Sequence, residues 1–178
     1  MPAFFDSLAV FVLYLFVDAL AFPIASTLYV AYMGERHAPW LVAGLGAIAT
    51  TAGSVAQYLA VRWLLAQPKL QWAWLVRLRA RVRGVLDGAG MATFWTLFVI
   101  YATPLGAGPL RVVAAAGGYP LVRFAGAILL GCLPYYAVVA WLGRAVKLPS
   151  WVYAVAMVAV IAFAGVIWMN RRVRERVS

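Results

Sequence analysis

The chain has 178 residues, of which 66% are hydrophobic and only 11% carry a charge, and its mean hydropathy is +0.92. Soluble domains have roughly 25% charged residues, so this chain carries too few charges to cover a water-facing surface. Its net charge of +10 does not indicate nucleic-acid binding, because the basic residues cluster beside long apolar runs. The composition predicts an integral membrane protein with no nucleic-acid partner.

Two basic clusters predict the orientation of the chain. One lies in the hydrophilic segment 67–90 and the other in the tail 171–178: Lys69, Arg77, Arg79, Arg81 and Arg83, then Arg171, Arg172, Arg174 and Arg176. Basic segments beside membrane spans remain on the cytoplasmic side, where they attract anionic lipid headgroups. We therefore expect a multi-pass protein of the cell (inner or plasma) membrane, with segment 67–90 and the C-terminus in the cytoplasm.

Two long apolar stretches, at 2–33 and 91–118, contain helix-breaking residues. The first is broken at Pro23, and the second at Pro104, Gly106, Gly108 and Pro109. In lipid every backbone polar group needs a partner, so a break is tolerated only where protein or a wet cavity covers it. Each stretch is either a re-entrant hairpin or a proline-kinked span. The crowded breakers favour a hairpin in the second stretch, whereas both readings stay open for the first.

Three further apolar stretches, at 40–66, 119–142 and 151–168, each predict a transmembrane helix. The stretch at 40–66 would be about 40 Å long as a helix, enough to cross a bilayer with tilt. The stretch at 151–168 has a tryptophan at each end, which matches the aromatic belts of membrane interfaces.

The two halves of the chain resemble each other. The breaking prolines, Pro23 and Pro104, precede Pro39 and Pro120 by the same spacing, and further matches pair Ala49, Gly53 and Tyr58 with Ala127, Gly131 and Tyr136. Each Ala-xxx-Gly pair predicts a close helix approach. With segment 67–90 inside, the two matched spans become antiparallel, which is an inverted-topology repeat.

The predicted fold is therefore an all-α integral membrane protein with an inverted repeat of two re-entrant, broken-helix hairpins. Each hairpin is followed by a transmembrane helix, and a C-terminal transmembrane helix is added. The single membrane domain divides into a first repeat (1–66), a basic surface segment (67–90), a second repeat (91–143), a terminal helix (149–170) and a basic tail (171–178).

Two charged residues stand out within the broken stretches. Asp18 lies five residues before Pro23, and an ionisable group at membrane depth is costly unless it faces a cavity or a partner. It is either a proton carrier or a hydrated interfacial residue near a helix end. Arg111 follows the second group of breakers. Its guanidinium can bind a phosphate with two hydrogen bonds, or it is an ordinary cytoplasmic-side anchor.

Nothing in the sequence predicts an enzyme, a metal site or a cofactor. His37 is the only histidine and Cys132 the only cysteine, so neither a catalytic triad nor metal-ligand spacing is formed. No glycine-rich phosphate loop follows a strand. The N-terminus also lacks the basic start of a cleaved signal peptide, because no Lys or Arg precedes Arg36.

The spacing of several motifs resembles the DedA/VTT family of membrane proteins, also called the SNARE-associated Golgi protein group. The matching residues are Phe22-Pro23-Ile24, Gly34, Pro39, Gly53 and Tyr58, then Phe98 to Pro104, Ala116-Gly117, Tyr119 to Phe124, Gly131 and Trp141 to Arg144. The resemblance covers nearly the whole chain. It implies two re-entrant hairpins that face each other across the bilayer. It also implies lipid movement or scrambling, for lipids that include undecaprenyl phosphate and phosphatidylethanolamine, in some members driven by the proton gradient.

The resemblance also assigns candidate substrate-binding residues. Asp18 stands where the family often has an acidic residue. The later acidic position falls at Thr27, the arginine before the second proline is replaced by Tyr101, and Arg111 takes the place of a further arginine only with a shifted hairpin. We therefore expect lipid headgroups to cross near Asp18, Thr27, Tyr101 and Arg111.

The predicted function is translocation or scrambling of an anionic or zwitterionic lipid, either a phospholipid or a polyprenyl phosphate. The departures from the family pattern leave an alternative open. In that case the chain is a non-transporting scaffold or accessory subunit of a larger membrane assembly. The predicted partners are membrane lipids, together with further copies of the chain or a larger membrane complex.

Overall fold

The computed structural model describes residues 6–20, 26–67, 90–103, 108–146 and 155. The described residues form six α-helices and no strand, which confirms the all-α prediction. The helices are α1 (Leu8–Leu20), α2 (Ser26–Arg36), α3 (Pro39–Ala66), α5 (Gly90–Tyr101), α6 (Gly108–Gly117) and α7 (Leu121–Val146). Of the predicted hairpin breaks, Pro23, Pro104 and Gly106 lie outside the described residues, and Gly108 and Pro109 open α6. Segments 67–90 and 147–178 lie largely outside them as well.

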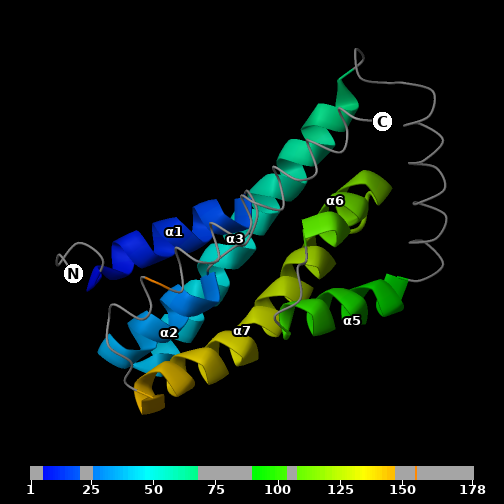
Figure 1. The fold of residues 1–178 in the computed structure, drawn as a ribbon. Helices are drawn as coiled ribbons and strands as arrows, with labels where there is room; N and C mark the ends of the chain where they lie inside the picture. Colours follow the sequence, from blue (N-terminus) through cyan, green and yellow to red (C-terminus); the bar gives the residue numbers. More distant parts are fainter. Residues whose placement is uncertain (1–5, 21–25, 68–89, 104–107, 147–154, 156–178) are drawn as a thin grey trace, which may run out of the picture.

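The core of the fold is the pair of long helices α3 and α7, which have 28 and 26 residues. Both are long and apolar enough to cross a membrane. They pack along each other in antiparallel directions (Figure 1). Trp40 near the start of α3 contacts Trp141 near the end of α7, with ring centroids 6.3 Å apart. At the other end the ring centroids of Tyr58 and Phe124 lie 4.9 Å apart.

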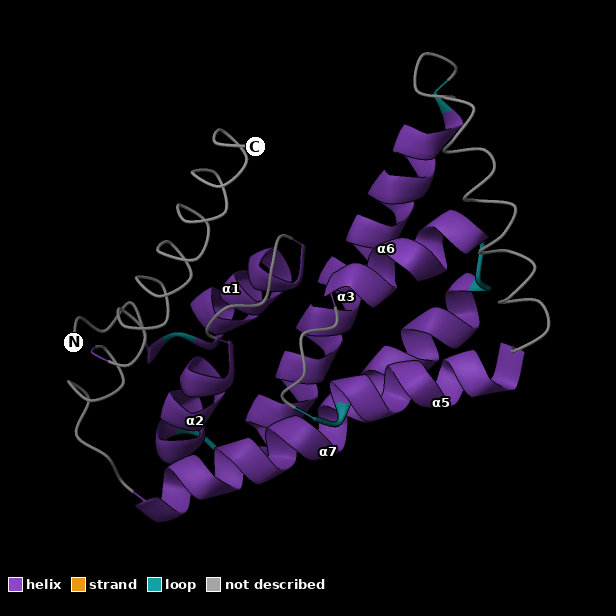
Figure 2. Ribbon diagram, turned by 45° about the vertical axis from the view of Figure 1, so that its right-hand side comes forward, coloured by secondary structure: helices purple, strands orange, loops and turns teal. Residues whose placement is uncertain are grey.

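The four short helices form two pairs, α1 with α2 and α5 with α6. In the first pair α1 packs on α3 and α2 packs on α7. In the second pair the partners are exchanged, so that α5 packs on α7 and α6 packs on α3 (Figures 1 and 2). Each pair therefore contacts both long helices. We call α1–α2 the first hairpin and α5–α6 the second hairpin.

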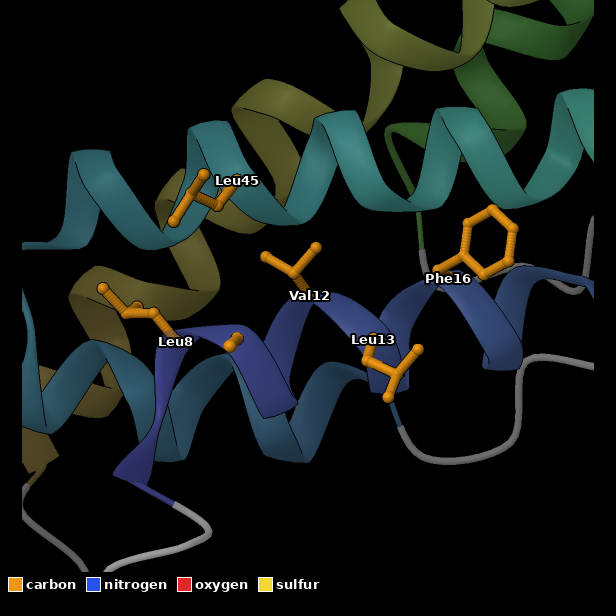
Figure 3. Close-up of a pocket in the computed structure, with 6 residues that line it drawn as sticks. Leu8, Val12, Leu13, Phe16 and Leu45 are labelled. Carbon is orange, nitrogen blue, oxygen red and sulfur yellow. The ribbon is translucent and has the colours of Figure 1, made fainter.

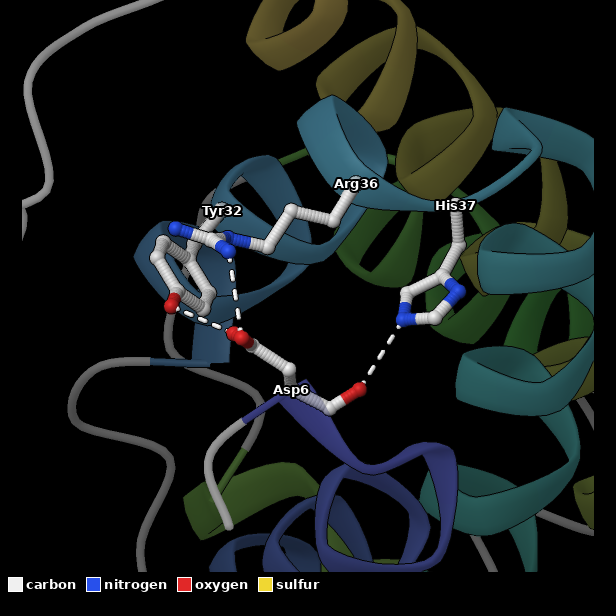
Figure 4. Close-up of polar contacts among 4 residues, drawn as sticks. All are labelled: Asp6, Tyr32, Arg36 and His37. Carbon is white, nitrogen blue, oxygen red and sulfur yellow. Dashed lines mark hydrogen bonds and ion pairs between the residues drawn. The ribbon is translucent and has the colours of Figure 1, made fainter. Parts of the chain in front are cut away.

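Hydrogen bonds hold together the two ends of the first hairpin (Figure 4). Asp6, just before α1, accepts a hydrogen bond of 2.7 Å from Tyr32 and forms an ion pair of 3.1 Å with Arg36, both near the end of α2. His37 donates from Nε2 to the main-chain oxygen of Asp6 over 2.9 Å. The chain thus enters and leaves the first hairpin at the end where α3 begins.

The second hairpin closes at the opposite end of the long helices. The Tyr119 hydroxyl donates to the carbonyl of Gly90, the first residue of α5, over 2.9 Å. The carbonyl of Tyr119 accepts a hydrogen bond of 2.5 Å from Tyr58, in the C-terminal half of α3. Both broken stretches therefore double back, and neither continues as a kinked span.

Local sequence explains where α6 and α2 end. At the end of α6, Gly118 has φ +76°. The amides of Gly118 and Tyr119 bond to the carbonyls of Ala115 and Ala114, which is a Schellman termination. Helix α2 continues to Arg36, three residues past the predicted limit at Met33. Its basic last turn suits the negative end of the helix dipole, and no proline intervenes before Pro39.

Glycines allow the helices to approach closely where the short helices meet the long ones. A Cβ atom at Gly53 of α3 would lie 2.3 Å from the Phe16 carbonyl oxygen of α1. At Gly131 of α7 it would lie 2.7 Å from the Phe98 carbonyl oxygen of α5. Both distances are shorter than real Cβ contacts, so only glycine fits. The predicted role of these glycines in close helix packing is confirmed.

Candidate functional site

A buried arginine lies where the tips of the two hairpins meet. Arg111, in the first turn of α6, is 1% exposed. Its Nη1 donates to the carbonyl of Ala19, at the end of α1, and lies 3.5 Å from the Ser54 hydroxyl of α3. Carbonyls at a helix C-terminus carry partial negative charge, which attracts a cation. Arg111 thus joins the second hairpin to the tip of the first.

The guanidinium of Arg111 has no counter-charge within the described part of the chain. No described carboxylate forms an ion pair with it, and its buried Nε has no hydrogen-bond partner there. A buried charge that lacks an opposite charge is costly, because neutral dipoles replace only part of its hydration. Such a group is chemically suited to accept an anion.

Tyr101 lies beside Arg111, as part of the same cluster. It is the last residue of α5, it is 9% exposed, and its hydroxyl lies 3.4 Å from the Ser54 hydroxyl. Ser54 itself is fully buried at the middle of α3. The structure therefore brings two of the predicted site residues, Tyr101 and Arg111, to one serine on a long helix. We call Tyr101, Arg111 and Ser54 the tip cluster.

The other two predicted residues lie nearer the first hairpin. Thr27, near the start of α2, forms a hydrogen bond of 2.9 Å with Tyr135 of α7. Asp18 is half-buried and immediately precedes Ala19, whose carbonyl binds Arg111. Its carboxyl group interacts electrostatically with Tyr14 and Tyr136. Asp18 thus neighbours the residue whose carbonyl binds Arg111, whereas Thr27 belongs to a separate contact between α2 and α7.

Sequence reasoning missed a row of hydroxyl groups on α3. Thr50, Ser54 and Tyr58 follow each other at intervals of four residues and are all buried. Thr50 bonds to Tyr136 of α7 over 2.9 Å, Ser54 belongs to the tip cluster, and Tyr58 bonds to Tyr119. Spacing by four places side chains on one helix face. The repeated hydroxyl in an apolar span was the signal in the sequence.

Tyr119 is a hydrogen-bond donor at the open end of the second hairpin, where α5 begins and α6 ends. We call this end of a hairpin its mouth. Burial raises the pKa of the Tyr119 phenol, and the positive charge of Arg123 opposes this rise. Because the phenol has an ordinary pKa of about 10, Tyr119 stays protonated near neutral pH. Its donor bond to Gly90 is therefore present under physiological conditions.

A groove of different chemistry lies at the surface between α1 and α3 (Figure 3). It has a volume of about 490 Å³ and is lined by Leu8, Ala9, Val12, Leu13, Phe16 and Leu45. We call it the α1 groove. Its lining is almost wholly apolar, and it involves none of the α1 residues Phe11, Leu15 and Ala19 that face the core. It offers no group to bind a polar headgroup.

The described residues contain no cluster of three His, Cys, Asp or Glu side chains able to hold a metal ion. What they do contain is a buried cation, Arg111, and the hydroxyl groups of Ser54 and Tyr101, beside the middle of α3. Comparison of the chain with protein-family models, curated proteins and solved structures finds no match.

Proposed function

We propose that this protein is a membrane translocase or scramblase for an anionic or zwitterionic lipid, either a phospholipid or a polyprenyl phosphate. In this proposal the first and second hairpins are re-entrant and belong to inverted repeats, and α3 and α7 are the spans that follow them. A further transmembrane helix at 149–170 completes the domain. The proposal retains the resemblance to the DedA/VTT family.

Membrane insertion is supported by the lengths and the surfaces of the long helices. Both α3 and α7 satisfy the length and hydropathy needed to span a bilayer. Both helices expose large apolar side chains. For example, Ile48 on α3 is 60% exposed and Val138 on α7 is 59% exposed. Such exposure is unfavourable in water but suits a surface that faces lipid. Trp40 and Trp141, at one end of the pair, fit an interfacial aromatic belt.

An inverted repeat is supported by the exchange of packing partners. Each hairpin packs its first helix on the long helix of its own half and its second helix on the long helix of the other half. Gly53 and Gly131 occupy corresponding positions, each against a carbonyl of the first helix of its hairpin. The two hairpins close at opposite ends of the long helices. Inverted repeats of broken helices place transport sites near the midplane.

The observation that carries the functional proposal is the buried guanidinium of Arg111 at the meeting point of the hairpins, which forms no ion pair with a described carboxylate. A phosphate in a lipid headgroup carries the negative charge that Arg111 lacks and can accept two of its hydrogen bonds. Ser54 and Tyr101 supply hydroxyl groups at the same place. Asp18 is a half-buried acidic residue next to Ala19 in the sequence. The acyl chains of the lipid would stay in the bilayer while the headgroup crosses.

The test is headgroup exchange in reconstituted vesicles with a fluorescent phospholipid. We expect wild-type protein to accelerate exchange above empty vesicles and Arg111→Gln to lower the rate about tenfold or more, because charged hydrogen bonds contribute about 1.5–3 kcal/mol. Arg111→Lys should retain part of the rate. The matched control is Arg123→Gln, since Arg123 is exposed. Equal rates for wild type and Arg111→Gln would remove Arg111 from the mechanism.

The scaffold alternative is favoured by the internal pairing of polar groups. Thr27 with Tyr135 and Thr50 with Tyr136 satisfy each other without a ligand. A scaffold needs no headgroup path, and its exposed apolar surface would bind other membrane proteins or further copies of the chain. Wild-type protein that is folded in vesicles but gives no exchange above empty vesicles would support this alternative and reject translocation.

A further inference from the structure

The α1 groove lacks a partner among the described residues. Ala9 and Leu13, on its α1 side, are exposed, and Leu13 has 62% of its surface free. Because Ala9 is small, another helix can approach α1 closely there. An empty groove loses the dispersion contacts that its lining would make with a well-packed neighbour. The groove therefore has the shape and chemistry of a helix-docking surface.

The end of α7 lies near the end of the molecule where this groove begins. The Trp40–Trp141 contact places the last turns of α7 beside the start of α3, and Leu45 of the groove lies little more than one turn along α3. The bond from His37 to Asp6 brings the start of α1 to the same end. The chain that leaves α7 at Val146 therefore starts close to the groove.

The sequence after α7 supplies a matching segment. Between Val146 and Trp151 there are four residues, which span about 13 Å when extended. Residues 151–168 follow, eighteen residues without a charge. As a helix they would be about 26 Å long, longer than the 13-residue α1. A tethered segment also has a high effective concentration at a nearby surface.

We propose that the apolar segment 151–168 docks as a helix in the α1 groove, against α1 and α3. The segment carries no charge that the apolar lining would leave unpaired. Its tether makes the contact intramolecular. This inference concerns assembly of the domain and does not depend on lipid transport.

Disulfide cross-linking of full-length protein in membranes tests the docking. In a Cys132→Ala background, Leu13→Cys is combined with single cysteines from Val152 to Val166, and a protease site is inserted in segment 67–90. A cross-link within one chain keeps the two fragments together after proteolysis. We expect cross-links that recur every three to four positions, because disulfides form only when Cβ atoms lie within about 4.5 Å. Leu59→Cys on α3, which also lies before the cleavage site and is 49% exposed, should give none.

Filling the groove gives a second, independent readout. Ala9→Leu should reduce the Leu13→Cys cross-link at least fivefold, because the larger side chain occupies the docking surface. Several results would overturn the proposal. Cross-links that join two chains would assign the groove to a second copy. Absence of cross-links at all positions would leave the groove to lipid acyl chains. Unchanged cross-linking with Ala9→Leu would also overturn it. None of these results bears on headgroup exchange.

Discussion

The Tyr119 hydroxyl donates a hydrogen bond of 2.9 Å to the carbonyl of Gly90, across 29 residues of sequence. This bond joins the first residue of α5 to the residue that follows Gly118 at the end of α6. It therefore closes the mouth of the second hairpin. Asp6 has the same function at the first hairpin through Tyr32, Arg36 and His37.

Removing the Tyr119 hydroxyl should loosen the second hairpin. We expect Tyr119→Phe to lower the free energy of unfolding in detergent by about 1 kcal/mol, the usual net value of one hydrogen bond. Amide hydrogen exchange should rise in the first turn of α5. Thr96→Val is the control, because Thr96 is exposed and bonds only within its own helix. Equal exchange in both variants would show that the bond does not hold the mouth.

The ion pair at the first hairpin should contribute less. Arg36 and Asp6 are 37% and 34% exposed, and exposed pairs contribute about 0.2–1 kcal/mol. A double-mutant cycle of Asp6→Asn and Arg36→Gln should give a coupling energy in this range that decreases at high salt. A coupling energy that is unaffected by salt would contradict the exposed geometry.

Close packing of α2 on α7 depends on Gly143. A Cβ atom there would lie 2.0 Å from the main-chain oxygen of Ala31. Gly143→Ala must therefore separate the helices, and we expect a loss of about 1–3 kcal/mol, typical of overpacking. Gly44→Ala is the matched control, because no atom lies within 4 Å of its added Cβ. The control should gain about 0.5–1 kcal/mol from lower backbone entropy in the unfolded chain. Equal losses would contradict the packing.

We expect that Arg111 lowers the free energy of unfolding of the protein although lipid transport requires it. Arg111→Met keeps the length of the side chain and removes a buried charge without a described counter-charge. We expect the free energy of unfolding to rise by on the order of 1 kcal/mol, because the desolvation cost disappears, and headgroup exchange to fall. Chemical denaturation and the vesicle assay measure the two effects separately. A large loss of stability would contradict this, because it would show that the hydrogen bonds of Arg111 to Ala19 and Ser54 outweigh the desolvation cost.

Sequence patterns predicted the helices because the breaks are local. The crowded breakers around Pro104 correctly favoured a hairpin in the second stretch. The first stretch was left open between a hairpin and a kinked span, because a single proline does not always end a helix, as Pro134 inside α7 shows. The small residues Gly53 and Gly131 also marked close helix contacts correctly. The extension of α2 to Arg36 was missed, because charged residues were read as the end of the apolar stretch and not as a helix terminus.

The candidate site was less predictable, because its members come from four helices. Nothing local to Arg111 indicates that its hydrogen-bond acceptor is the main-chain carbonyl of Ala19, 92 residues away. A main-chain acceptor leaves no mark on the sequence. Ser54 was overlooked for a related reason, since a single hydroxyl in an apolar span attracts attention only when the row of Thr50, Ser54 and Tyr58 is considered together.

Cysteine accessibility in oriented vesicles tests most directly whether both hairpins are re-entrant. In a Cys132→Ala background, single cysteines replace Ser7 and Ala38 at the mouth of the first hairpin, and Met91 and Val122 at the mouth of the second. We predict that a membrane-impermeant maleimide labels Ser7→Cys and Ala38→Cys from one side of the membrane, and Met91→Cys and Val122→Cys from the other. Labelling of the two members of either pair from opposite sides would contradict the account.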